Sequence, residues 1–248
     1  MHLAGATFIL SVFYLSVGLG EIAPILQSMV CSRSDPDLSK CVTNAMNSIR
    51  SALALGDFGA GRTAPMLDPY QIKTLDIRNG QNFEVLLRNA TIEGIGDYKI
   101  TELREDLPQK KFNFRLNLPS LFVKGKYDLN MYVLLSRIFG KGNFNMTLID
   151  TLADVTAQYF LEPKDGKNLV QFKPLDIKLK FDKARFYLDN LFDGDQNLGQ
   201  FGNNAINSFP SLLLDQVKPG IEAHLTRSVT KMANAVVSGA EEQEILLP

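Results

Sequence analysis

The sequence predicts an α+β protein in which a strongly curved antiparallel sheet wraps around a long C-terminal helix. Two patterns support this prediction. From about residue 70 to 190, polar and apolar side chains alternate with a period of two, which is typical of strands with one polar, solvent-exposed face and one apolar face. From residue 208 to 237, apolar side chains return every three or four residues, which is typical of an amphipathic helix. So long a helix cannot cover its own apolar stripe, and the one-sided sheet is its natural partner.

The N-terminus carries the pattern of a secretory signal peptide. Leu3–Leu19 is a nearly continuous apolar run without Lys, Arg, Asp or Glu, and the small residues Gly18 and Gly20 provide a cleavage site directly after it. We therefore expect a signal peptide over residues 1–20, a single domain over residues 21–248, and a secreted, extracellular protein. The alternative is an uncleaved membrane anchor, because the run approaches the length that spans a bilayer.

The chain has only two cysteines, Cys31 and Cys41. In an oxidising compartment such an even pair predicts a disulfide bond, with two free buried thiols as the alternative. Asp35 is a suitable N-cap, and Pro36 suits the first position of a helix. The bond would then tie an N-terminal arm to a helix over residues 36–55.

That first helix has one apolar face, and a glycine-rich connector follows it. The face consists of Leu38, Val42, Ala45, Met46, Ile49 and Leu53. The connector Gly56–Gly61 follows a helix and does not open one, whereas a phosphate-binding loop follows a strand and opens a helix. A nucleotide site is therefore not expected here.

About eight strands are expected in meander order, separated by turns at Asp106–Gln109, Gly140–Gly142 and Pro163–Gly166. The clearest inward-facing sets are Phe112, Phe114, Leu116 and Leu118; Tyr127, Leu129, Met131 and Val133; Phe144, Met146 and Leu148; and Leu175, Ile177, Leu179 and Phe181. These inward positions are all uncharged. The residues between them, Asn145 among them, should face water.

The last part of the chain returns to helix. A short helix is expected over Leu198–Asn207, and a long one begins with Ser208 as N-cap and Pro210 in its first turn. Its apolar stripe consists of Leu213, Val217, Ile221, Leu225 and Val229. Gly239 should end it.

Composition excludes several classes of function. The formal net charge of −1 gives no strong field to recruit nucleic acid, and no segment after the N-terminal run suggests stable membrane insertion. The chain after residue 20 holds one histidine, His224, and no further cysteines, so neither a metal site nor a cofactor is expected. Two sequons, at Asn89 and Asn145, fit glycosylation of a secreted protein. We further expect a monomer.

Several stretches together resemble the takeout family, relatives of insect juvenile hormone-binding proteins. They are CSRSDPDLSKC, LDPYQI, KGKYDLNMYVLLSRIFGKGNFNMTLID, YLDNLFDGDQNLG, KPGIEAHL and the terminal EILLP. The sequence departs from the family pattern at Ser136-Arg137, where Leu-Pro or similar is usual, and near Phe209, where a tryptophan is usual. The resemblance covers the whole chain after residue 20.

The resemblance implies a tubular lipid-binding fold and a secreted carrier with a small hydrophobic ligand, such as a terpenoid or fatty acid, in an internal apolar tunnel. Juvenile hormone-binding proteins carry a second disulfide, which this chain lacks the cysteines to form, so juvenile hormone is not singled out. The strand register and the resemblance together predict these tunnel residues: Phe114, Leu116, Leu129, Met131, Val133, Phe144, Met146, Val217, Ile221 and Leu225.

Other interpretations remain open from the residues alone. The same apolar faces could form a solid core, since apolar faces are core more often than pocket. A protein acting through its surface, as a signal or a structural component, is a second possibility. A lipid esterase is a third, but a catalytic triad would depend on His224, and no Gly-x-Ser-x-Gly elbow occurs. We therefore expect a protein that is not an enzyme.

Overall fold

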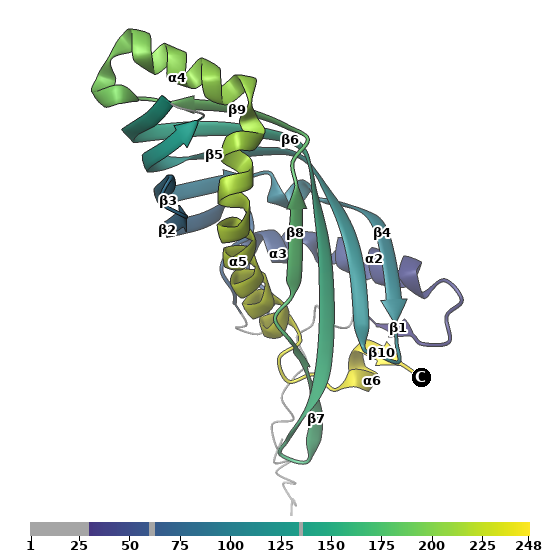
Figure 1. Ribbon diagram of the computed structural model, residues 1–248. Coiled ribbons are helices and arrows are strands. Elements are labelled where there is room, and N and C mark those ends of the chain that lie inside the picture. Colours follow the sequence, from purple (N-terminus) through teal and green to yellow (C-terminus); the bar gives the residue numbers. More distant parts are fainter. Residues whose placement is uncertain (1–29, 60–62, 134–135) are drawn as a thin grey trace, which may run out of the picture.

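The computed structural model describes residues 30–59, 63–133 and 136–248, so the predicted signal peptide lies outside the described residues. It confirms the α+β prediction: a curled antiparallel sheet of eight strands runs along the long helix α5 (Figure 1). The strands are β2 (Tyr70–Asn79), β3 (Phe83–Glu93), β4 (Lys99–Asp106), β5 (Lys111–Val133), β6 (Ser136–Lys164), β7 (Lys167–Phe172), β8 (Asp176–Lys180) and β9 (Lys183–Leu188). The order β2-β3-β5-β6-β7 forms the main path; β4 pairs with β5, and β8 and β9 pair with β6.

The other elements lie against this sheet or at its ends. The helices are α2 (Leu38–Ser48), α3 (Arg50–Leu55), α4 (Gln196–Ser208), α5 (Pro210–Val236) and α6 (Glu242–Ile245), with short 3₁₀ turns η1 (Ile95–Asp97) and η2 (Phe192–Gly194). Strands β1 (Cys31–Ser32) and β10 (Leu246–Leu247) form a separate parallel pair. This pair brings the start of the described chain to its C-terminus, as Figure 1 shows at the lower right.

The prediction of a turn at Gly140–Gly142 was wrong, because β6 continues through it and pairs with β5 along almost its whole length. The glycines instead allow a close approach of the segment that follows β9. A Cβ atom on Gly140 would lie 2.8 Å from the Cα of Leu191, and one on Gly142 would lie 2.8 Å from the carbonyl oxygen of Asp189. The other two predicted turns separate β4 from β5 and β6 from β7.

The first helix begins later than predicted and is interrupted. Asp35 does not cap it; its Oδ1 accepts a hydrogen bond of 2.8 Å from the backbone N–H of Asp37, which closes a local turn. The helix starts at Leu38, so Pro36 precedes it, and it breaks at Ile49 into α2 and α3. Short polar side chains that bond their own backbone favour such turns over helix.

Helices α4 and α5 begin close to the predicted residues, although the N-cap assignment of Ser208 was wrong. Asp195 caps α4 by accepting from the backbone N–H of Leu198. Phe209 stands at the N-cap of α5, and Pro210 is its first residue, where a missing N–H has no helical partner to lose. Gly239 has the positive φ of 79°, three residues after α5 ends.

Side chains of α4 and α5 complete the hydrogen bonds of one sheet edge. Asn203, Asn207 and Asn234 each bond both the N–H and the C=O of one strand residue: Leu188, Phe186 and Phe172, respectively. Thr230 and Glu222 accept from the N–H groups of Leu175 and Leu179. An unpaired edge N–H or C=O would carry a free-energy cost if it were buried, so these bonds fix both helices to the edge.

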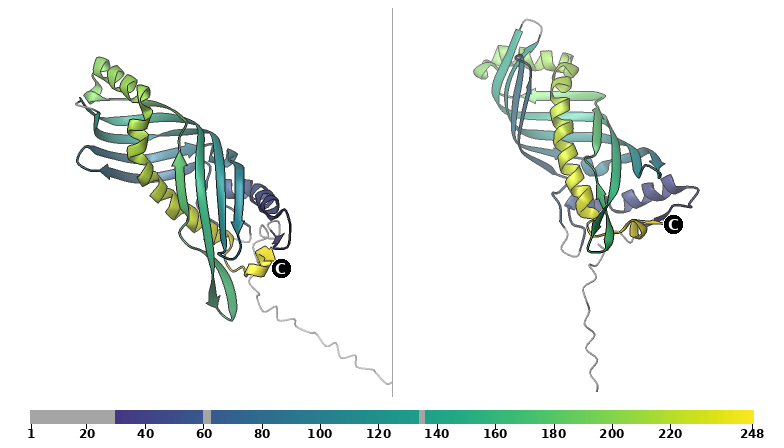
Figure 2. Two further views of the ribbon diagram at one scale, coloured as in Figure 1. Left: turned by 45° about the vertical axis from the view of Figure 1, so that its right-hand side comes forward. Right: turned by 60° about the horizontal axis from the view of Figure 1, so that its bottom comes forward.

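Helix α5 also contacts the opposite edge strand, β2. Asn79 donates to the side-chain oxygen of Gln216 at 2.7 Å. Gly220 packs directly on Ile77, since a Cβ at Gly220 would lie 2.7 Å from Ile77 Cγ1. The helix therefore bridges the two edges of the curled sheet and closes its open side, as both views in Figure 2 illustrate.

Candidate functional site

The curled sheet and helices α2, α3 and α5 line a cavity of about 380 Å³. Six of the predicted tunnel residues line it, namely Phe114, Leu116, Phe144, Met146, Ile221 and Leu225. They come from β5, β6 and α5, so residues far apart in the sequence form one wall. Side chains of this kind offer a ligand apolar burial.

The structure places three of the other four predicted residues elsewhere. Leu129 and Met131 are each 2% exposed and belong to the main hydrophobic core, at the end of the sheet where β5 meets β3. Val217 packs against the same core without lining the cavity. The side chain of Val133 lies outside the described part of the chain.

Several lining residues were not assigned to the tunnel from the sequence. They include Val42, Met46, Ile49 and Leu53 of the first helical segments, Ile177 and Leu179 of β8, and Ala153, Val155 and Ala157 of β6. The helical face and the β8 alternation were visible in the sequence. What it did not show was that these faces meet the sheet around an open space.

The second half of β6 was missed because its alternation changes phase. Phe144, Met146 and Leu148 face the cavity, but the next lining residues are Thr151 and Ala153. Asp150 between them has a positive φ of 53°, and its pair with Pro119 is missing from an otherwise constant β5–β6 register. The lining positions shift by one residue on both strands at this point, from Leu148 to Thr151 on β6 and from Leu118 to Leu121 on β5.

Four of the lining residues carry polar side-chain atoms: Tyr98, Thr151, Tyr159 and Glu242. The Tyr98 hydroxyl donates to the carbonyl of Met46 at 2.9 Å. The Tyr159 hydroxyl donates to Glu242 Oε1 at 2.7 Å. The polar groups are therefore few and mostly engaged within the protein.

Glu242 gathers three donors at the α6 end of the cavity. Lys110 Nζ lies 2.6 Å and Arg33 Nη2 2.7 Å from its Oε1, which also accepts from Tyr159. Burial alone would raise the pKa of the Glu242 carboxyl, but the hydrogen bonds from Lys110, Tyr159 and Arg33 outweigh it and lower the pKa to about 2. For Tyr159, burial and the same carboxylate raise the pKa.

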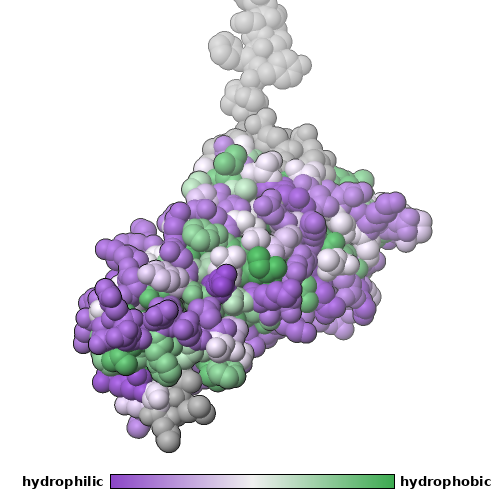
Figure 3. Space-filling model, turned by 90° about the horizontal axis from the view of Figure 1, so that it is seen from above, coloured by the Kyte–Doolittle hydropathy of each residue, from purple (hydrophilic) through white to green (hydrophobic). Residues whose placement is uncertain are grey.

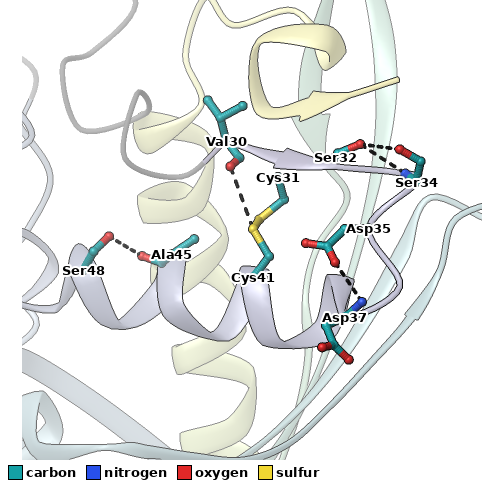
Figure 4. The surroundings of a disulfide bond; sticks show 9 residues. All are labelled: Val30, Cys31, Ser32, Ser34, Asp35, Asp37, Cys41, Ala45 and Ser48. Carbon is teal, nitrogen blue, oxygen red and sulfur yellow. Dashed lines mark hydrogen bonds between the residues drawn. A yellow bond between two sulfur atoms is a disulfide. The ribbon is translucent and has the colours of Figure 1, made fainter.

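The disulfide Cys31–Cys41 is present at this same end (Figure 4). It joins β1 to α2, and Cys31 itself lines the cavity. Leu246 of β10 lines it too, and β10 pairs with β1. The disulfide arm and the C-terminal segment thus close the α6 end together.

Other candidate groups lie away from the cavity wall. The ring of His224 on α5 contacts Tyr70, with ring centroids 6.0 Å apart, and burial lowers its pKa. Asn89 and Asn145 are exposed on the sheet. Within residues 30–59, 63–133 and 136–248, no three His, Cys, Asp or Glu side chains are grouped so that they could hold a metal ion.

A family model described as haemolymph juvenile hormone binding protein matches residues 9–247. The chain belongs to this family. In the crystal structure of Epiphyas postvittana Takeout 1, the same fold recurs with a TM-score of 0.78 and 21% sequence identity, covering 89% of this chain and 100% of that one. The tubular α+β fold predicted from the takeout resemblance is therefore confirmed.

Two relatives of similar sequence are circadian clock-controlled proteins named daywake. The Drosophila yakuba protein is 23% identical over 172 residues, which cover 64% of this chain and 66% of its own length. The Drosophila melanogaster protein is 23% identical over 187 residues, which cover 71% and 72% of the two chains.

The outer surface of this family member is mixed in character. Figure 3, which views the molecule from above, shows separate apolar patches among hydrophilic side chains. Exposed apolar side chains include Leu198 and Phe201 on α4 and Phe209 and Leu212 near the start of α5. Among the helices of the described ranges, none has both the length and the apolar content needed to span a bilayer.

Proposed function

We propose that this protein is a secreted carrier that holds a small hydrophobic ligand in the cavity between the sheet and α5. The observation that supports this most directly is the cavity wall, which is apolar apart from four residues. Apolar burial contributes about 25 cal/mol per Å², so such a wall favours molecules such as terpenoids or fatty acyl compounds.

Secretion and glycosylation belong to this proposal. The disulfide bond fits an oxidising compartment, and residues 1–20 have the composition of a signal peptide. The exposed positions of Asn89 and Asn145 would leave room for glycans on the outer face of the sheet. The single-chain cavity needs no second copy to be complete, which favours a monomer.

Binding rather than catalysis is the function that the geometry favours. His224, which an esterase triad would need, contacts Tyr70 and is not part of the cavity wall. A base held outside the cavity cannot reach a ligand within it. We therefore propose that the protein is not an enzyme.

A tunnel-filling substitution tests the carrier function. Ala153 lies on the inner face of β6 and is 5% exposed, so Ala153→Phe would place a ring in the cavity. We expect this variant to lose most of its uptake of a fluorescent fatty acid, measured by titration. Leu152→Phe is the matched control, because Leu152 is the preceding residue and is not part of the wall; it should bind as wild type does.

The folded state of both variants is checked by thermal unfolding. Native mass spectrometry of wild type from its own tissue should show a copurified apolar molecule. Absence of both copurified lipid and probe uptake in wild type would exclude the carrier function and favour a role of the outer surface.

A further inference from the structure

Helix α4 and the start of α5 carry a stripe of exposed apolar side chains, here called the α4 stripe. Its members Leu198, Phe201 and Phe209 are 48%, 59% and 62% exposed, and Leu212 is 44% exposed. Helical spacing places the first three on one side of α4, and the backbone N–H of Leu212 donates to the carbonyl of Phe209 at 3.0 Å. Ile206, on another side of α4, is buried in the main core. The core therefore holds the helix without using the stripe.

The stripe lies in a part of the chain that has no charge. Charged residues make up 21% of the sequence, yet residues 196–214 contain none, and this is the longest uncharged run after the predicted signal peptide. The polar side chains beside the stripe include the exposed amides of Gln200 and Asn204. The nearest charges along the chain, Asp195 and Asp215, are both acidic. A partner that fits this surface is therefore apolar and carries no excess of negative charge.

The place of α4 in the fold leaves the stripe accessible. Helix α4 lies across one end of the molecule, away from the C-terminus, as Figure 1 and both views of Figure 2 show. Figure 3 looks down on this end and shows apolar patches among hydrophilic side chains. A flat surface can reach a helix at an end of the molecule without first meeting the sheet.

The size of the stripe favours a membrane over a second protein. At about 200 Å² for a large side chain that is fully exposed, the four residues present roughly 400 Å² at their exposed fractions. A specific protein–protein interface buries about 800 Å² on each partner. A bilayer requires no such minimum area, because each side chain that reaches the acyl chains gains apolar burial by itself.

We propose that the α4 stripe docks the protein on the surface of a zwitterionic phospholipid bilayer. The four side chains enter the boundary between headgroups and acyl chains, and the neighbouring amides bond the headgroups. Docking is shallow and reversible, since the stripe is far smaller than a membrane-spanning helix. None of its four residues lines the cavity, so the docking surface is tested without a ligand and independently of the carrier function.

Sedimentation with vesicles tests the proposal. The full chain is mixed with sucrose-loaded vesicles of palmitoyl-oleoyl phosphatidylcholine, and the pelleted fraction is measured over a series of lipid concentrations. Wild type should bind. Phe201→Ser combined with Phe209→Ser should lower the partition coefficient by about tenfold or more, because two large apolar side chains lose their burial in lipid.

A matched control removes the same residue types from another part of the surface. Phe122 of β5 and Phe160 of β6 are 38% and 41% exposed and lie outside the stripe. Phe122→Ser combined with Phe160→Ser should bind vesicles as wild type does. Both double variants should unfold at the temperature of wild type, because the substituted side chains are exposed.

A tryptophan placed in the stripe gives a second measurement, which records a gain of signal. The chain has no tryptophan, so a single introduced one reports only its own surroundings. With vesicles, the emission of Phe201→Trp should shift to shorter wavelength and should be quenched by brominated phosphatidylcholine. Phe122→Trp should show neither change.

Lipid charge distinguishes this docking from an electrostatic contact elsewhere on the protein. Replacing part of the phosphatidylcholine by phosphatidylserine should not strengthen binding, and raising the salt concentration about tenfold should not weaken it. Binding that requires phosphatidylserine and disappears in salt would overturn the proposal. Failure of wild type to bind vesicles at any lipid concentration would overturn it too. Self-association of lipid-free wild type that the two serines abolish, in a protein that binds no vesicles, would instead make the stripe an interface between two copies.

Discussion

Strand β5 passes through two regions of the molecule that differ in how they are filled. At one end its inward Leu129 and Met131 are each 2% exposed, in a core that also contains Ile206 of α4 and Leu213 of α5. At the other end the inward Phe114 and Leu116 line the cavity. The two ends have the same alternation and similar side chains. The two ends differ in the helices that pack over them. The end with Leu129 and Met131, here called the filled end, packs against α4 and the start of α5. The end with Phe114 and Leu116, here called the hollow end, faces α2, α3 and the rest of α5 across the cavity.

The largest effect should come from truncating the same residue type at the two ends of β5. Leu129→Ala should lower the free energy of unfolding by about 2–5 kcal/mol, because it empties part of a filled core. Leu116→Ala should cost less, because its side chain already borders open space. Denaturant unfolding of both variants measures this difference. Equal losses would mean that the hollow end is packed as well as the filled one.

A smaller effect, confined to the hollow end, should follow from removing the disulfide. Replacing Cys31 and Cys41 by Ser should lower the free energy of unfolding by about 2–3 kcal/mol on the chain-entropy account of a short loop. Hydrogen exchange should become faster in β1 and α2 and stay unchanged around Leu129. Faster exchange at both ends would show that the two regions are not independent.

The smallest expected effect is on stability at low pH, and it depends on the carboxyl group of Glu242. The pKa of Glu242 falls from 4.5 to about 2 in the folded protein, so the folded state resists protonation of this carboxyl. Its contribution to stability is therefore complete above about pH 4.5 and is lost as the pH falls toward 2. Glu242→Gln should be less stable than wild type near neutral pH, and the difference in unfolding temperature should shrink in this window. Glu84→Gln, on an exposed side chain of β3, is the control and should track wild type.

Much of the fold could be predicted from the sequence, because alternation and helical periodicity report which face is apolar. The strands, α4, α5 and the disulfide follow from such local signals. The irregular backbone at Asp150 could not be predicted, because it lies opposite Pro119 of β5, a residue distant in sequence, and the inward positions change phase there after Leu148. The glycines of β6 were misinterpreted for a related reason, since their role is the approach of residues 189–191, which are distant in sequence.

The candidate site was predictable only in part. Periodicity identified Phe114, Leu116, Phe144, Met146, Ile221 and Leu225 as inward residues, and the structure brings these six together. It could not distinguish them from Leu129 and Met131, because facing inward does not specify what lies opposite. Whether an apolar face becomes core or wall is decided by tertiary packing.

The amides that bond α4 and α5 to the sheet edge have a consequence for self-association. A strand edge with free N–H and C=O groups is a template on which another chain can add a strand and start aggregation. Asn203, Asn207 and Asn234 occupy those groups on residues of β9 and β7. The edge that would otherwise invite a neighbouring molecule is already occupied by the protein's own side chains, so a hollow, sheet-rich body can have a blocked edge without closing into a full barrel.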